Sequence, residues 1–156
     1  MSEKHFLDWQ MWVSHIFDGR PLSRIGDLSW REVDDGFQWG GRTYEAGTVF
    51  RASIRSPNKI IQSKVWYVYN DDEPYWRDLV WYPEIMEPTA DGVYEGHVEG
   101  RLPDAWLVEV KDIAQGFAGY LSSTPQDITG KPTKERISRG SRSRLWAPKS
   151  KKPGTM

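Results

Sequence analysis

The sequence predicts an all-β fold, an immunoglobulin-like β-sandwich of seven to eight short strands with one N-terminal amphipathic helix and a basic C-terminal tail. Short apolar runs recur at regular spacing between turn residues over 21–125. Nine Trp, seven Tyr and five Phe favour pleated surfaces, because aromatic side chains pack well there. Fourteen Gly and ten Pro separate many short elements.

The helix is expected over 4–17, within an N-terminal segment of residues 1–20. Gly19 suits the position after its last turn, and Pro21 prevents its continuation. A helix with a large apolar face must dock on something. The residues expected to bind a partner lie on one stripe of 3.6-residue period, which Phe17 extends: Phe6, Trp9, Val13 and Ile16.

The strands of the sandwich domain are expected at 28–33, 37–44, 48–55, 64–69, 78–85, 92–99, 105–112 and 119–123. Asp34, Asp35 and Gly36 form a hairpin signal between the first two. Residues 65–69 are apolar on both faces, as in a central strand. The alternation over 106–111 predicts a core face made by Trp106, Val108 and Val110.

Residues 126–156 are expected to form a flexible basic tail, because few apolar side chains there would offset the entropy of ordering. Nine Lys or Arg and one acid fall within 131–156, whereas the other residues carry 12 basic and 21 acidic side chains. Such a tail favours salt-dependent contact with nucleic acid. It also suits an anchor on an acidic surface or a merely solubilising role.

Several functions find no support in the sequence. Cysteine is absent, which excludes disulfides, Cys-ligated zinc and a thiol nucleophile. No Gly-x-Ser-x-Gly nucleophile elbow occurs. We therefore expect a non-enzymatic protein without metal or cofactor. No apolar run is long enough to span a bilayer, and the N-terminus does not read as a signal peptide, so a soluble chain is expected.

A second candidate surface is an aromatic segment, since flat aromatic faces stack on sugar rings. Trp81 and Tyr82 belong to the same run, and core packing explains such residues equally well. The residues expected to bind a carbohydrate ligand are Tyr75, Trp76, Arg77 and Asp78.

Two polar clusters resemble metal or proton-transfer sites. Glu95, His97 and Glu99 share one strand face by period-two spacing, for which a solvated outer face is the favoured interpretation. The acidic loop 70–73 carries carboxylates of the kind that calcium prefers. Its spacing does not match a calcium loop, and an ordinary turn explains it as well.

Three features together resemble a known family: a terminal helix leading into residues 19–22, the Trp-rich runs 65–68 and 76–81, and residues 106–112. They are similar to the C-terminal part of PhoPQ-activated pathogenicity-related proteins over about residues 5–125. Members are α/β-hydrolase-like proteins whose last helix leads into a small immunoglobulin-like domain. The hydrolase part is not in this sequence, so the resemblance implies an accessory domain and transfers no catalytic residue.

The resemblance therefore predicts a non-catalytic domain that packs on a hydrolase-like partner or parent domain. One alternative is a carbohydrate-binding module that uses surface aromatics. Another is an assembly protein whose basic tail holds a larger particle that contains nucleic acid.

Overall fold

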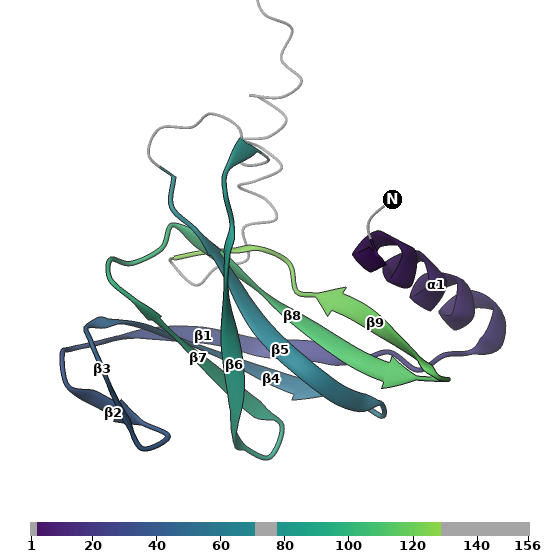
Figure 1. Cartoon of the computed structure of the whole chain (residues 1–156), viewed down its shortest axis with the longest axis horizontal. Coiled ribbons are helices and arrows are strands. Elements are labelled where there is room, and N and C mark those ends of the chain that lie inside the picture. Colours follow the sequence, from purple (N-terminus) through teal and green to yellow (C-terminus); the bar gives the residue numbers. More distant parts are fainter. Residues whose placement is uncertain (1–2, 71–77, 129–156) are drawn as a thin grey trace, which may run out of the picture.

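The chain is mostly β, with one helix beside a curled antiparallel sheet (Figure 1). The structure, a computed structural model, describes residues 3–70 and 78–128. Most of the basic tail predicted at 126–156 and part of the acidic loop lie outside these residues. The elements are α1 Glu3–Asp18, β1 Arg24–Val33, β2 Phe37–Trp39, β3 Arg42–Tyr44, β4 Gly47–Arg55, β5 Lys59–Val68, β6 Tyr82–Ala90, β7 Val93–Glu99, β8 Ala105–Ala114, β9 Phe117–Ser122 and β10 Gln126–Asp127.

Strand β6 makes the sheet curl. The strand order is β1-β4-β7-β6-β5-β8, with β9 and β10 both paired to β8. The first half of β6 pairs with β5 and its second half with β7. The two halves of the sheet therefore enclose one core, whose buried members are Phe50, Ala52, Ile54, Val65, Met86, Val98, Trp106, Val108 and Val110.

The expected strand at 78–85 was wrong in its bounds, because the strand begins at Tyr82 and continues to Ala90. Within β6, Pro88 pairs with Tyr94 next to a register shift. Among the described strands each half of β6 has one neighbour, so a proline, which lacks an N–H, is tolerated on the unpaired side.

The expected strand at 37–44 is instead a hairpin of its own, β2–β3. Gly40 and Gly41 both have positive φ, 57° and 77°, which suits a tight two-residue turn. Strand β1 pairs with β4 and not with β2. The sequence signal at residues 34–36 thus marks the connection into a separate hairpin, which lies below β1 and β7 in Figure 1.

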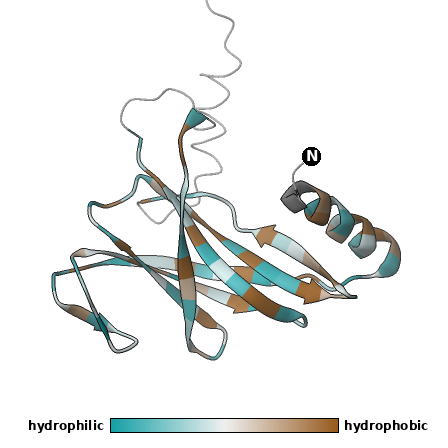
Figure 2. Ribbon diagram, viewed as in Figure 1, coloured by the Kyte–Doolittle hydropathy of each residue, from teal (hydrophilic) through white to brown (hydrophobic). Residues whose placement is uncertain are grey.

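The helix packs against β9, which it approaches closely (Figure 2). Met11 and Ser14 are buried at this contact, and Met11 is only 1% exposed. A Cβ at Gly119 would lie 2.6 Å from Met11 Sδ, so glycine permits the approach. Gly19 ends the helix with φ of 68°, as its sequence position predicted.

Arg20 ties the end of α1 to the β8–β9 hairpin. Its side chain is fully buried, and Nη2 lies 2.8 Å from Asp112 Oδ1. Nη1 donates hydrogen bonds to the carbonyls of Ala114 and Phe117, at 2.7 and 3.1 Å. Ser23 and Asn58 donate to the other oxygen of Asp112. The carboxylate is thus well satisfied, as a buried charge requires.

Candidate functional site

The helix presents a broad apolar surface to solvent. We call it the apolar face of α1, made of the exposed residues Phe6, Trp9, Trp12, Ile16 and Phe17. Trp9 is 61% and Ile16 69% exposed, although the opposite side of the same helix is docked on β9. Phe6 and Trp9 have ring centroids 6.4 Å apart, so they form one continuous surface.

The four residues predicted to bind a partner fall on or beside this face. Phe6, Trp9 and Ile16 are exposed, whereas Val13 is half-buried. Sequence reasoning did not include Trp12, which lies between Trp9 and Ile16 along the helix and widens the face around its axis. The 3.6-residue period located the stripe, but it did not indicate that the other side of α1 docks on the sheet.

The predicted carbohydrate-binding segment is described only at its end. Tyr75, Trp76 and Arg77 lie outside the described residues, and Asp78 is exposed. Trp81 is half-buried, whereas Tyr82 is exposed, with its ring 5.9 Å from that of Tyr67. Their expected role as a sugar platform stays a prediction.

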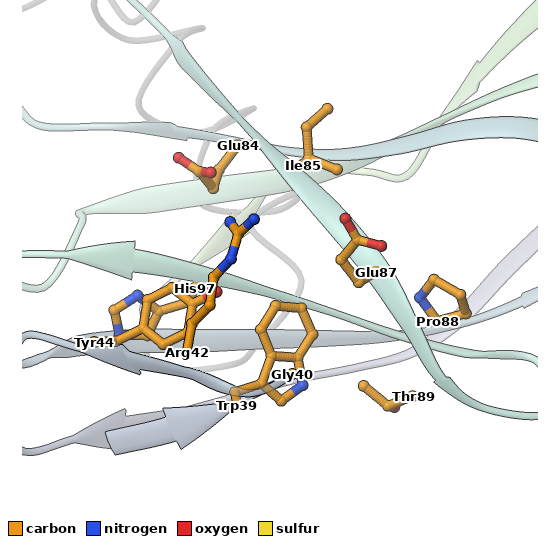
Figure 3. Close-up of a pocket in the computed structure, with 10 residues that line it drawn as sticks. All are labelled: Trp39, Gly40, Arg42, Tyr44, Glu84, Ile85, Glu87, Pro88, Thr89 and His97. Atoms are coloured by element: carbon orange, nitrogen blue, oxygen red, sulfur yellow. The ribbon is translucent and has the colours of Figure 1, made fainter. Parts of the chain in front are cut away.

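A pocket of about 810 Å³ lies between the β2–β3 hairpin and strand β6 (Figure 3). We call it the hairpin pocket. Figure 3 shows side chains of the hairpin facing those of β6 across it. It is lined by Trp39, Gly40, Arg42, Tyr44, Glu84, Ile85, Glu87, Pro88, Thr89 and His97.

His97 of β7 lies under the hairpin. Its ring stacks on Phe37, with centroids 5.8 Å apart and planes at 16°, and packs against Tyr44 at 4.6 Å. The residue is only 7% exposed, and both ring nitrogens are buried. Burial lowers the pKa of His97, while the Glu99 carboxylate and a hydrogen bond with the Glu45 backbone oppose that shift. The imidazole is therefore neutral at physiological pH.

The favoured interpretation of Glu95, His97 and Glu99 as a solvated face was wrong for the first two, which are buried. The hairpin, which the sequence did not separate from the main sheet, covers this part of β7. Glu95 accepts a hydrogen bond from Arg31 at 3.3 Å, and Glu99 is exposed. Within 3–70 and 78–128, no three His, Cys, Asp or Glu side chains are grouped to hold a metal ion.

The remaining polar groups of the hairpin pocket come from two strands. Arg42 is on β3, and Glu84 and Glu87 are on β6. Partial burial raises the pKa of Glu84, against an opposing hydrogen bond from the Ile85 backbone. Sequence reasoning missed this pocket. Its one local signal is the pair of aromatics that flank the Gly40–Gly41 turn, Trp39 and Tyr44.

Comparisons with protein-family models, curated proteins and solved structures found no match to this chain. Among the described residues, no helix has both the length and the apolar character needed to cross a membrane.

Proposed function

We propose that this chain is a non-catalytic accessory domain that docks on a protein partner through the apolar face of α1. The observation that carries the proposal is an anchored helix whose large apolar side chains are in solvent. Exposed contiguous apolar patches of this kind are typical of interaction sites. Trp and other aromatics are also the residues that contribute most to interface energy.

A protein partner fits this face better than a lipid surface does. Interfacial membrane helices carry many Lys and Arg on the polar face. Helix α1 has one Lys, no Arg and three acids, Glu3, Asp8 and Asp18. An anionic headgroup surface would repel these acids, whereas the apolar surface of a protein would not.

The proposed partner is an α/β-hydrolase-like domain, in the same chain or in another. The support is the resemblance of residues 5–125 to the accessory region of such proteins, in which a helix leads into the small domain. We also propose that the curled sheet is an immunoglobulin-like sandwich. In support, the Phe50 ring of one half lies 4.7 Å from Trp106 of the other.

A photo-crosslinking amino acid at position 9 tests the docking proposal in the cells that produce the protein. The matched control places the same amino acid at Gln38, an exposed position on β2. We expect the position-9 variant to crosslink to one α/β-hydrolase-like protein, identified by mass spectrometry. The control should not crosslink to that protein.

Two outcomes contradict the proposal. Crosslinks from position 9 to a second copy of this chain would make the face a self-association surface. Absence of crosslinks at position 9, with the variant folded, would mean that the face stays in solvent. In a further control, Ile16→Glu should abolish the specific crosslink because it adds a charge to the contact.

A further inference from the structure

We propose that the hairpin pocket binds a neutral sugar, with Trp39 as the stacking surface and Arg42, Glu84 and Glu87 as hydrogen-bonding groups. This site is separate from the apolar face of α1 and does not depend on the docking proposal. It is also distinct from the predicted segment 75–78.

The first support is a buried ring that lines the pocket. His97 lines the pocket, and its ring packs on Phe37 and Tyr44 of the hairpin. Both ring nitrogens are buried, so His97 offers a ligand its ring surface rather than a hydrogen bond.

The second support is the balance of charges around the pocket. Arg42 only donates hydrogen bonds, while the carboxylates of Glu84 and Glu87 only accept them. Among the described residues, no ion pair or side-chain hydrogen bond engages Arg42 or Glu87. Hydroxyl groups both donate and accept, so a vicinal diol matches this mixture. The two carboxylates oppose an anionic ligand, and Arg42 opposes a cation.

The third support is the aromatic wall. Trp39 and Tyr44 line the pocket, with ring centroids 6.1 Å apart. Such rings offer apolar faces to the C–H groups of a sugar. The volume of about 810 Å³ lies within the usual range of small-molecule sites.

The pocket is held in shape before any ligand arrives. The hairpin stacks on His97 through Phe37, and the Arg31 guanidinium lies 5.8 Å from the Phe37 ring while pairing with Glu95. Asp35 accepts a hydrogen bond of 2.7 Å from the Ala46 N–H at the base of the hairpin. A preformed site loses less entropy on binding.

The test is an NMR titration of the full chain with the methyl glycosides of glucose, galactose, mannose and N-acetylglucosamine. We expect at least one to shift the Trp39 indole and His97 ring signals in a saturable way. Trp39→Ala should weaken that binding at least tenfold, and Glu87→Gln should weaken it severalfold. Trp9→Ala, a matched change on α1, should leave it unchanged.

The proposal is overturned if none of the four glycosides shifts the Trp39 and His97 signals. It is equally overturned if binding survives in a folded Trp39→Ala variant, or if Trp9→Ala weakens it as much. Tighter binding of methylammonium or of a sulfated glycoside would contradict the choice of a neutral ligand. The crosslinking result at position 9 is independent of every one of these outcomes.

Discussion

Arg20 holds the end of α1 to the β8–β9 hairpin through a buried ion pair and two hydrogen bonds. Its ion pair with Asp112 is buried, and a buried pair that loses one partner costs about 3–5 kcal/mol, because an uncompensated charge remains. Arg20→Ala should therefore lower the free energy of unfolding by about that amount in urea titrations. Arg24→Ala, at an exposed position on β1, should change it by less than about 0.5 kcal/mol. Equal effects would contradict the anchoring role.

Gly47 permits the close pairing of β4 with β7. A Cβ there would collide with the backbone carbonyl of Val98, which cannot move without disturbing the ladder. Gly47→Ala should cost about 1–3 kcal/mol of stability, as overpacking usually does. Gly26→Ala is the control, because a Cβ at that position meets open space. Similar thermal midpoints for the two variants would show that the contact is not tight.

His97 should make the free energy of unfolding depend on pH. Its folded pKa is lowered by burial, so the unfolded chain takes up the proton at a higher pH than the native state does. The stabilising contribution is complete above the unfolded value of about 6.5 and is lost as the pH falls toward the folded pKa. Urea midpoints should thus fall in mild acid, and His97→Gln should flatten that fall. Parallel pH profiles for the two proteins would contradict this assignment.

At the scale of the element, side-chain truncation should speed hydrogen exchange of α1 on its docked side but not on its exposed side. Met11→Ala removes the side chain that packs on β9 and should cost about 2–5 kcal/mol of local stability. Hydrogen exchange of the α1 amides should then accelerate while the sheet amides keep their protection. Trp9→Ala should leave exchange unchanged, because its side chain is already exposed. Faster exchange in Trp9→Ala alone would mean that the helix docks by its other face.

Periodicity predicted the helix and most strands, because their apolar residues follow the period of the element or form a short continuous run. The alternation at Trp106, Val108 and Val110 is confirmed by their burial, and strand β5 is central as its two apolar faces indicated. The pattern failed at 37–44, since Phe37 and Tyr44 pack on His97 of β7 rather than in the main core.

The candidate sites depend on tertiary contacts that no local pattern encodes. His97 and Glu95 look like outward residues of β7, and only the hairpin that folds over them makes them buried. The four predicted residues of α1 were located by their period alone. The side of the helix that remains exposed is set by the packing of Met11 on Gly119, which is more than a hundred residues away in the chain.

At the scale of the whole molecule, the fold presents two separate candidate surfaces. One is on helix α1, which is docked on β9 (Figure 1) and turns its apolar face to solvent. The other is the hairpin pocket, which lies between the β2–β3 hairpin and β6. Protein docking and sugar binding should therefore be lost independently of each other. Trp9→Ala should affect only the first and Trp39→Ala only the second.

The most direct test of the central claim is the solvent exposure of Trp9, measured by fluorine NMR on the full chain with its nine Trp residues fluorinated. A paramagnetic gadolinium chelate should broaden the Trp9 signal of the free monomer and spare that of buried Trp106. Adding the α/β-hydrolase-like partner recovered by crosslinking should then protect Trp9. A Trp9 signal as protected as that of Trp106 in the free monomer, or still fully broadened in the complex, would contradict the account.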